Sequence, residues 1–324
     1  MPILLYKYQL EAKAQWDAFV REARNATFLF ERDFMDYHKD RFVDSSLMFT
    51  NAKGKLIGVL PANLRLDEKR VDTHGGLTYG GLLLKKDTSL LQVKEMLVAA
   101  AEHYQKMGIE TLRYKPLPYI YHRYPSQEDL YWLFRAEATL TARAVSTCID
   151  LNEALPFSTL RRRKVKKAEA EQFVIENDGA QNWNDYWKIL TQVLQEQHQT
   201  KPVHSLSEIS RLKAHFPEKI QLYTVHGLEQ CLAGCVTFDC GEVLHIQYIS
   251  SSNTGKEYGA LDFLFRQLIS DYQAKGKHYF DFGISTEQGG IWLNEGLLFQ
   301  KEGFGGRAVC YDCYEISLDK LIRL

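Results

Sequence analysis

The chain has 324 residues, of which 45% are hydrophobic and 25% are charged, and its formal net charge is −1. This length exceeds that of one typical compact domain, so we expect two domains with substantial cores. Because basic and acidic residues are interspersed, the charge excludes a global nucleic-acid-binding or membrane-surface signature, and contacts of either kind must be local.

The first half of the chain alternates strand-like and helical segments. Residues 46–51 and 55–66 are β-type runs that flank a short Gly-containing turn, which predicts a hairpin. Residues 93–104 have apolar side chains at helical spacing and predict a helix that ends near Gly108. A further strand is expected at residues 110–115.

The second half repeats this order of elements. Residues 220–240 predict a hairpin, residues 243–250 a strand and residues 258–272 an amphipathic helix. A Tyr-Gln-x-x-Gly motif stands at the helix end in both halves, but it is short enough to recur by coincidence. The matching order of elements is the stronger sign of duplication. We therefore predict an α/β fold with mixed sheets, in two similar domains at residues 1–145 and 146–324.

The strand at residues 243–250 and the loop after it organise the second domain. His245 and Gln247 share one predicted strand face, where polar side chains need a partner, water or a ligand. The loop is rich in residues that turn the backbone sharply, namely Asn253, Thr254, Gly255 and Gly259. Uncovered amides at the following helix start would attract phosphate, although such loops often serve only to turn the chain.

Two further segments carry concentrated charge or capping signals. Six basic residues fall within seven positions, namely Arg161, Arg162, Arg163, Lys164, Lys166 and Lys167. They predict either a phosphate-attracting surface or an ordinary solvated helix face. Near the C-terminus, Asn294 and Gly303 are suited to begin and end a short helix. Lys301 lies in its last turn, where a cation also stabilises the helix dipole.

These segments together resemble the GNAT acyltransferase fold, and two such domains joined by a basic helix resemble its FemABX-like branch. The resemblance is carried by TLRRRKVKKAEAE, HIQYISSSNTGKEYGAL, HYFDFGIS and above all LNEGLLFQKEGFGGR, which resembles a FemABX pattern of Phe and Lys followed by Phe-Gly. The family's pyrophosphate loop has Gly at two fixed points. Here Tyr258 replaces the first of them if Ala260 takes the second.

The resemblance implies direct acyl transfer to an amine, with tandem acyl-CoA N-acyltransferase-like domains and the donor in the second. Lys301 would hold a donor phosphate or stabilise an oxyanion. The implied donor-binding residues are Asn253, Thr254, Gly255, Lys256, Gly259 and Ala260. Proton-transfer candidates are His245, Tyr248, Asp281 and Glu295, each of which could equally be structural. Candidates for binding the acceptor or a phosphate are Arg161, Arg162, Arg163, Lys201 and His204.

The leading prediction is therefore an acyltransferase that uses acyl-CoA as donor substrate and a small-molecule or nucleotide-linked amine as acceptor, without a metal. The alternatives are an aminoacyl-tRNA-dependent transferase acting on a cell-wall-type precursor and a non-catalytic binding protein on a decayed scaffold. Neither a signal-like N-terminus nor a run of about 20 apolar residues is present, which predicts a cytoplasmic protein. The six cysteines are expected to be buried free thiols.

Overall fold

The computed structural model describes residues 3–324, without the side chain of His198. The chain divides into two compact units, which we describe separately. Unit 1 consists of Met1–Ala144, Glu287–Trp292 and Cys310–Leu324, and unit 2 consists of Val145–Thr286 and Leu293–Val309. Two long strands, β9 (Thr139–Asp150) and β17 (Arg307–Ser317), contribute residues to both units.

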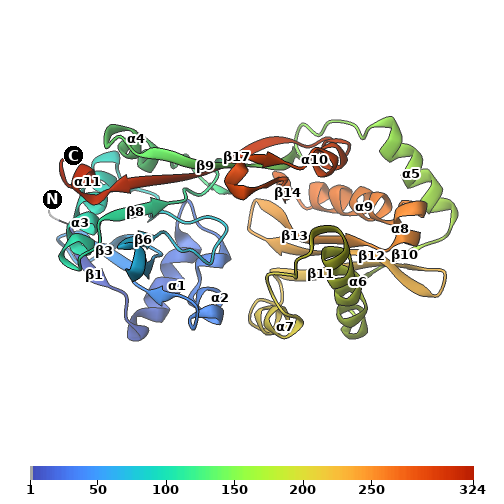
Figure 1. Ribbon diagram of the computed structural model, residues 1–324, viewed down its shortest axis with the longest axis horizontal. Helices are drawn as coiled ribbons and strands as arrows, with labels where there is room; N and C mark the ends of the chain where they lie inside the picture. The colour runs from blue at the N-terminus through green and yellow to red at the C-terminus, as the bar shows by residue number, and fades with distance from the viewer. Residues whose placement is uncertain (1–2) are drawn as a thin grey trace. The chain divides into compact units, whose positions relative to one another are not determined.

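Unit 1 contains two groups of paired strands with helices packed around them (Figure 1). The order is β1-β3-β4-β7 in one sheet and β17-β8-β6-β5-β2 in the other, where β6 and β8 run parallel. Its elements are β1 (Leu4–Lys7), α1 (Lys13–Glu22), α2 (Arg32–Met35), β2 (Val43–Asp44), β3 (Leu47–Thr50), β4 (Leu56–Leu60), β5 (Asn63–Arg65), β6 (Arg70–Asp72), β7 (Leu83–Leu84), α3 (Leu90–Lys106), β8 (Thr111–Tyr114), α4 (Glu128–Arg135) and α11 (Leu318–Ile322).

Unit 2 is a sheet of order β10-β11-β12-β13-β14-β9, in which β13 and β14 run parallel and the other neighbours antiparallel. Helices α6 and α9 both pack on β11, β12 and β13, and Figure 1 shows them on opposite faces. The elements are α5 (Thr159–Ala170), β10 (Val174–Asn177), α6 (Ala180–His198), α7 (Leu206–His215), β11 (Ile220–Gly227), β12 (Gln230–Asp239), β13 (Val243–Ser251), α8 (Asn253–Tyr258), α9 (Ala260–Ala274), β14 (Tyr279–Ile284) and α10 (Glu295–Glu302). The short strands β15 (Thr286–Glu287) and β16 (Trp292–Leu293) pair with each other.

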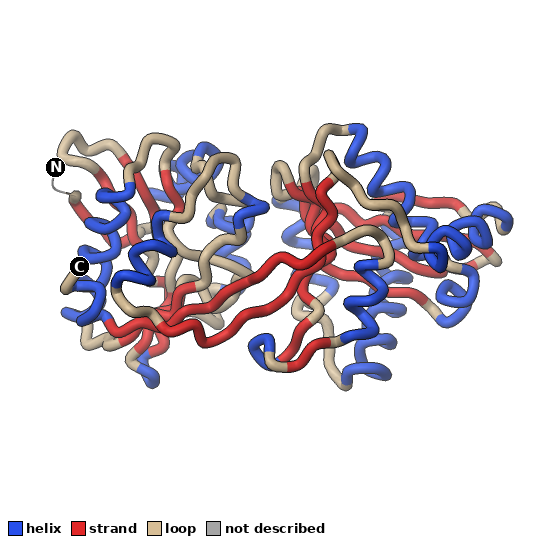
Figure 2. Tube along the Cα trace, turned by 90° about the horizontal axis from the view of Figure 1, so that it is seen from above, coloured by secondary structure: helices blue, strands red, loops and turns tan. Residues whose placement is uncertain are grey.

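The core of unit 2 lies between α9 and the sheet. Leu261, Leu264, Phe265, Leu268 and Tyr272 recur at three- and four-residue steps along α9 and are all buried. They belong to a cluster that also contains residues of β11 to β14, so the helical stripe read from the sequence is the stripe that packs on the strands. Figure 2 shows the strands in red and the helices in blue beside them.

The two units share the repeated plan that the sequence predicts. Each contains an antiparallel hairpin, β3-β4 in unit 1 and β11-β12 in unit 2. In each, a helix ends next to a glycine with positive φ, Gly108 or Gly276, before a strand that pairs in parallel with an earlier one. The mixed α/β fold class with two related units is therefore confirmed.

Three local expectations are wrong. First, β13 does not alternate strictly, because its pairing shifts from Val236–Tyr248 to Thr237–Ile246 and leaves Gln247 as the extra residue of a β-bulge. Second, most of the loop predicted after β13 is helical, because Asn253–Tyr258 form the helix α8. Third, Cys310 is exposed rather than buried, because β17 alternates and Cys313 takes the inward position.

None of the described helices combines the length and the apolar character that crossing a bilayer requires. Within residues 3–324, no group of three or more His, Cys, Asp or Glu side chains is placed to hold a metal ion.

Candidate active site

Strands β13 and β14 pair over a short stretch and then separate. Val243–His245 pairs in parallel with Tyr279–Asp281, after which β13 continues to Ser251 along β12 and β14 continues along β9. Among the described strands, none fills the resulting gap. Backbone groups that lose a strand partner need another one, so the gap suits a ligand with amide or carbonyl groups.

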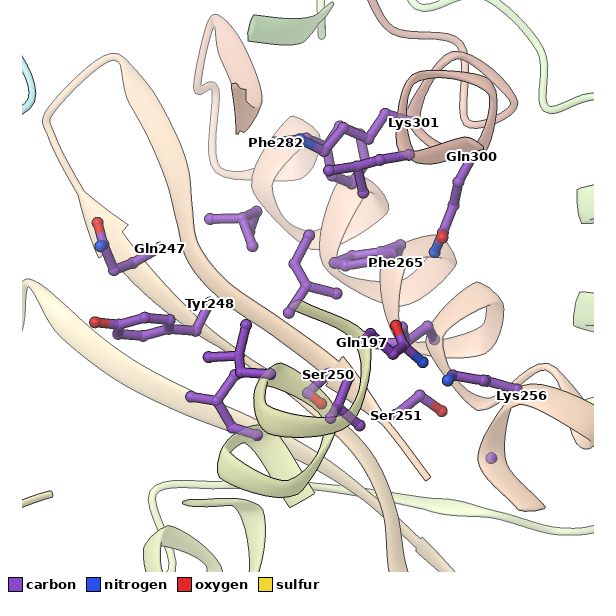
Figure 3. Close-up of a pocket in the computed structure, with 18 of the residues that line it drawn as sticks. Gln197, Gln247, Tyr248, Ser250, Ser251, Lys256, Phe265, Phe282, Gln300 and Lys301 are labelled. Carbon is purple, nitrogen blue, oxygen red and sulfur yellow. The ribbon is translucent and has the colours of Figure 1, made fainter. Parts of the chain in front are cut away.

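A cavity of about 690 Å³ opens at this gap, and all of its lining residues belong to unit 2. Leu190 and Leu194 of α6 form part of one wall, and Leu261 and Phe265 of α9 form part of another. Figure 3 shows Lys301 and Phe282 at one end of the view and Ser251 and Lys256 at the other, with Phe265 between them. The cavity thus has an apolar middle, with the cationic side chains of Lys301 and Lys256 at its two ends.

Lys301 is a buried cation in the wall of this cavity. It lies in the last turn of α10, whose N-cap is Asn294 and whose C-cap is Gly303, as the sequence predicts. The side chain is 3% exposed, and its Nζ donates hydrogen bonds of 2.8 Å to the carbonyl oxygens of Gly283 and Ile284. Burial lowers the pKa of Lys301 to about 8, while the charge of Asp281 acts in the opposite direction. An ammonium that donates two hydrogen bonds still has a third hydrogen to offer.

The half-buried His245 and the fully buried Asp281 form a hydrogen-bonded pair beside the gap, where their strands are in register. His245 Nδ1 lies 2.9 Å from Asp281 Oδ2, and Ser146 and the amide of Gly283 donate to Oδ1 of the same carboxylate. Asp281 is fully buried. Neither member of the pair lines the cavity, so the structure places both behind its wall.

Tyr248 lines the cavity and contacts His204. Its hydroxyl accepts a hydrogen bond from the backbone amide of His204 and lies 2.6 Å from His204 Nδ1. Because the amide already donates to this oxygen, the Tyr248 hydroxyl can donate to Nδ1 when the ring nitrogen is unprotonated. Lys201 also lines the cavity and is exposed, whereas His204 is buried. Two candidates from separate segments are thus brought together.

The corner after β13 differs from the uncovered turn expected from the sequence. Ser252 is the N-cap of α8, and its hydroxyl accepts from the amide of Gly255, so that amide is not available. Lys164 and Lys167 of α5 donate to the carbonyl oxygens of Lys256 and Glu257. Of the proposed donor-binding residues, Gly255 and Lys256 line the cavity, whereas the others do not, namely Asn253, Thr254, Gly259 and Ala260.

Helix α5 divides its basic residues between the interior and the surface. Arg161, Val165 and Ala168 are buried. Arg161 Nη1 pairs with Asp262 Oδ1 at 2.9 Å, and its guanidinium lies 5.2 Å from the Phe304 ring centre. Arg161 and Lys164 line the cavity. The exposed basic residues of the helix are Arg162, Arg163, Lys166 and Lys167.

Glu295, a predicted proton-transfer residue, lies apart from the site, and Ser250 is a cavity residue that the sequence did not single out. Glu295 is exposed in the first turn of α10 and does not line the cavity. Ser250 does line it, is 3% exposed, and has a buried hydroxyl with no hydrogen-bond partner among the described residues. Such a group is expected to meet a ligand or water. The sequence offered one indication that Ser250 belongs to the site, namely its place on the predicted strand two residues after Tyr248.

Comparison with known proteins defines the class. Residues 158–288 match the family model described as an acetyltransferase (GNAT) domain, and these residues contain α5, the sheet strands β10 to β14 and α9. The matched class is an acyltransferase domain, and the prediction of a GNAT-fold acyltransferase is confirmed for this part of the chain. A search of curated protein sequences gives no match.

Particular solved structures extend the likeness to the whole chain. FemX superposes with a TM-score of 0.70 at 12% identity, covering 98% of this chain and 99% of its own. L-PGS from Bacillus licheniformis gives 0.59 at 12%, covering 94% and 91%. A tandem GNAT protein from the clavulanic acid biosynthesis pathway gives 0.52 at 11%, covering 98% of both chains. The predicted FemABX-like tandem fold is thus confirmed.

Proposed function

We propose that the protein transfers an acyl group from acyl-CoA to an amine. One observation carries this proposal: a single cavity of unit 2 joins the gap between β13 and β14, the buried ammonium of Lys301 and the side chain of Lys256. A thioester carried on a phosphorylated arm needs these three features, since the arm needs a slot, the carbonyl a cation and the phosphates positive charge.

The reaction needs no covalent enzyme intermediate. The neutral amine attacks the thioester carbonyl, the oxyanion that forms is stabilised by the third Lys301 hydrogen, and collapse expels the thiolate. The amine gives up one proton and the thiolate takes up one, so protons balance. Tyr248 lines the cavity, and its hydroxyl proton can pass to the leaving sulfur when His204 Nδ1 carries a hydrogen and donates to the tyrosine oxygen.

Lysine side chains, more than helix amides, are expected to attract the donor's phosphates. The Gly255 amide is bonded to Ser252, whereas the exposed Lys256 side chain and the half-buried Lys164 line the cavity. The Lys164 ammonium donates to the Lys256 carbonyl, which brings this lysine to the end of α8. This arrangement replaces the glycine-rich cradle that the sequence lacks.

Donor binding is tested by thermal unfolding with CoA and acetyl-CoA. A ligand at one hundred times its dissociation constant stabilises the folded state by about 2.7 kcal/mol, so a clear rise of the unfolding midpoint is expected. A Lys164→Glu/Lys256→Glu double variant is expected to abolish most of the rise. Lys188→Glu is the matched control, because Lys188 is an exposed residue of α6 outside the cavity wall. Absence of a shift with any thioester would contradict the acyl-CoA proposal.

A second candidate, transfer from an aminoacyl-tRNA to a cell-wall-type precursor, is favoured by the outward basic face of α5. Arg162, Arg163 and Lys166 are exposed to solvent on neighbouring turns of α5. Binding through such residues weakens steeply with salt, because counterions are released from the nucleic acid. Filter binding of aminoacyl-tRNA at low and physiological salt tests this candidate. No binding at low salt would remove it.

A further inference from the structure

Lys301 and Asp281 act on the same turn of backbone from two sides. The pairing of β14 with β9 shifts between Asp281–Cys148 and Ile284–Ser146, so β14 carries an extra residue there. Gly283 lies in this bulge with a φ of +73°. Its amide donates to Asp281 Oδ1 at 3.1 Å, and its carbonyl accepts from Lys301 Nζ at 2.8 Å.

The carboxylate is itself held rigidly. Asp281 is fully buried, and Ser146 of β9 and His245 of β13 donate to its two oxygens. A buried carboxylate with hydrogen bonds to both oxygens has one orientation available. The direction of the Gly283 carbonyl, and with it the place of the Lys301 ammonium, therefore follows from Asp281.

We propose that Asp281 is a positioning residue that holds the Lys301 ammonium at the reacting carbonyl through the Gly283 turn, with Ser146 and His245 fixing its carboxylate. This inference rests on the proposed function, because it takes Lys301 as the group that meets the substrate. It differs from a proton-transfer role for Asp281, since the carboxylate lies behind the cavity wall and never touches substrate.

The charge of Asp281 also reaches Lys301. Burial lowers the pKa of Lys301, and Asp281 raises it, so removing the carboxylate charge is expected to lower this pKa further. Other titratable or charged groups stand on the elements around Lys301, namely Arg161 on α5, His245 on β13, Asp262 on α9, and Glu295 and Glu302 on α10 itself. Of these groups, only His245 is hydrogen-bonded to Asp281, so a change in the Lys301 titration of an Asp281→Asn variant reports the loss of the Asp281–His245 pair.

Asp281→Asn keeps the size of the side chain, but it removes the charge and one of the two oxygens through which Ser146, His245 and the Gly283 amide hold the carboxylate in one orientation. Acyl transfer that requires charged Lys301 is lost as the pH rises through the Lys301 pKa, so the basic limb of the rate profile is expected to move to lower pH. We expect kcat to fall about tenfold, as when a group in an active site loses its alignment. The donor KM should stay unchanged.

Asp239→Asn, which breaks a Lys277 ion pair outside the cavity wall, is the matched control and should leave both the rate and the profile unchanged.

Nuclear magnetic resonance of lysine labelled at Cε and Nζ measures the Lys301 titration directly and does not depend on catalytic activity. The Lys301→Met variant identifies the Lys301 signal by its absence. A lower midpoint in Asp281→Asn supports the proposal, and an unchanged midpoint overturns it even if the wild-type enzyme is active. A wild-type protein without transferase activity would refute the proposed function, while the titration would still test the coupling.

Gly283→Ala provides a second variant if Asp281→Asn does not fold. A Cβ there meets nothing closer than 3.4 Å, so only the positive φ is strained. We expect it to lower kcat without changing the donor KM, and an unchanged kcat would overturn the role of the turn.

Discussion

Lys301→Met is expected to lower kcat/KM by about 10²–10³-fold, the effect of removing one preorganised oxyanion donor. Methionine keeps the length and apolar stem of the side chain, so the packing of α10 should persist. The loss should fall mainly on kcat, because the ammonium acts on charge that develops in the transition state. Steady-state kinetics with an acyl-CoA and an amine acceptor measure this change.

The matched control is Lys188→Met, since Lys188 is exposed on α6 and pairs with Asp185 at the surface. It should retain wild-type kcat and KM. A Lys301→Met protein that folds normally and retains full kcat would show that the buried ammonium is structural, a cation that satisfies the Gly283 and Ile284 carbonyls and nothing more.

Arg161→Ala is expected to destabilise unit 2 by about 3–5 kcal/mol, because it leaves the Asp262 carboxylate buried without its partner. The two side chains are 9% and 4% exposed, and Arg161 also packs on the Phe304 ring. Chemical denaturation followed by circular dichroism measures the loss. Arg162→Ala, its exposed neighbour on α5, should change stability by less than about 0.5 kcal/mol.

A double variant, Arg161→Met/Asp262→Leu, separates the two causes of that loss. Replacing both charges by apolar groups removes the desolvated carboxylate, so most of the stability should return. If Arg161→Ala alone were as stable as wild type, the buried ion pair would contribute nothing to folding. Arg161 would then be a candidate phosphate ligand, the role that its sequence context predicts.

Local signals predicted much of the fold. The α9 stripe from Leu261 to Tyr272 and the caps of α10 at Asn294 and Gly303 follow from spacing and residue type alone, and both occur as expected. The hairpin β11-β12 likewise follows from its β-type runs. These features depend on neighbours within a few residues, which a sequence shows directly.

The site was harder to predict, because its contacts join distant residues. The extra residue Gln247 in β13 depends on the register with β12, which no local pattern fixes. Ser146 and Asp281 are separated by most of unit 2 in sequence but share a hydrogen bond. Six basic residues on α5 looked alike, yet tertiary packing placed Arg161 inside and Arg162 outside.

The central claim is that the cavity of unit 2 holds an acyl donor with its carbonyl at Lys301. A crystal structure with a stable acyl-CoA analogue, in which a thioether-linked ketone replaces the thioester, tests it most directly. We expect the arm in the gap between β13 and β14, its phosphates near Lys256, and the ketone oxygen within about 3 Å of Lys301 Nζ. An analogue bound elsewhere, or with its carbonyl turned away from Lys301, would contradict this account.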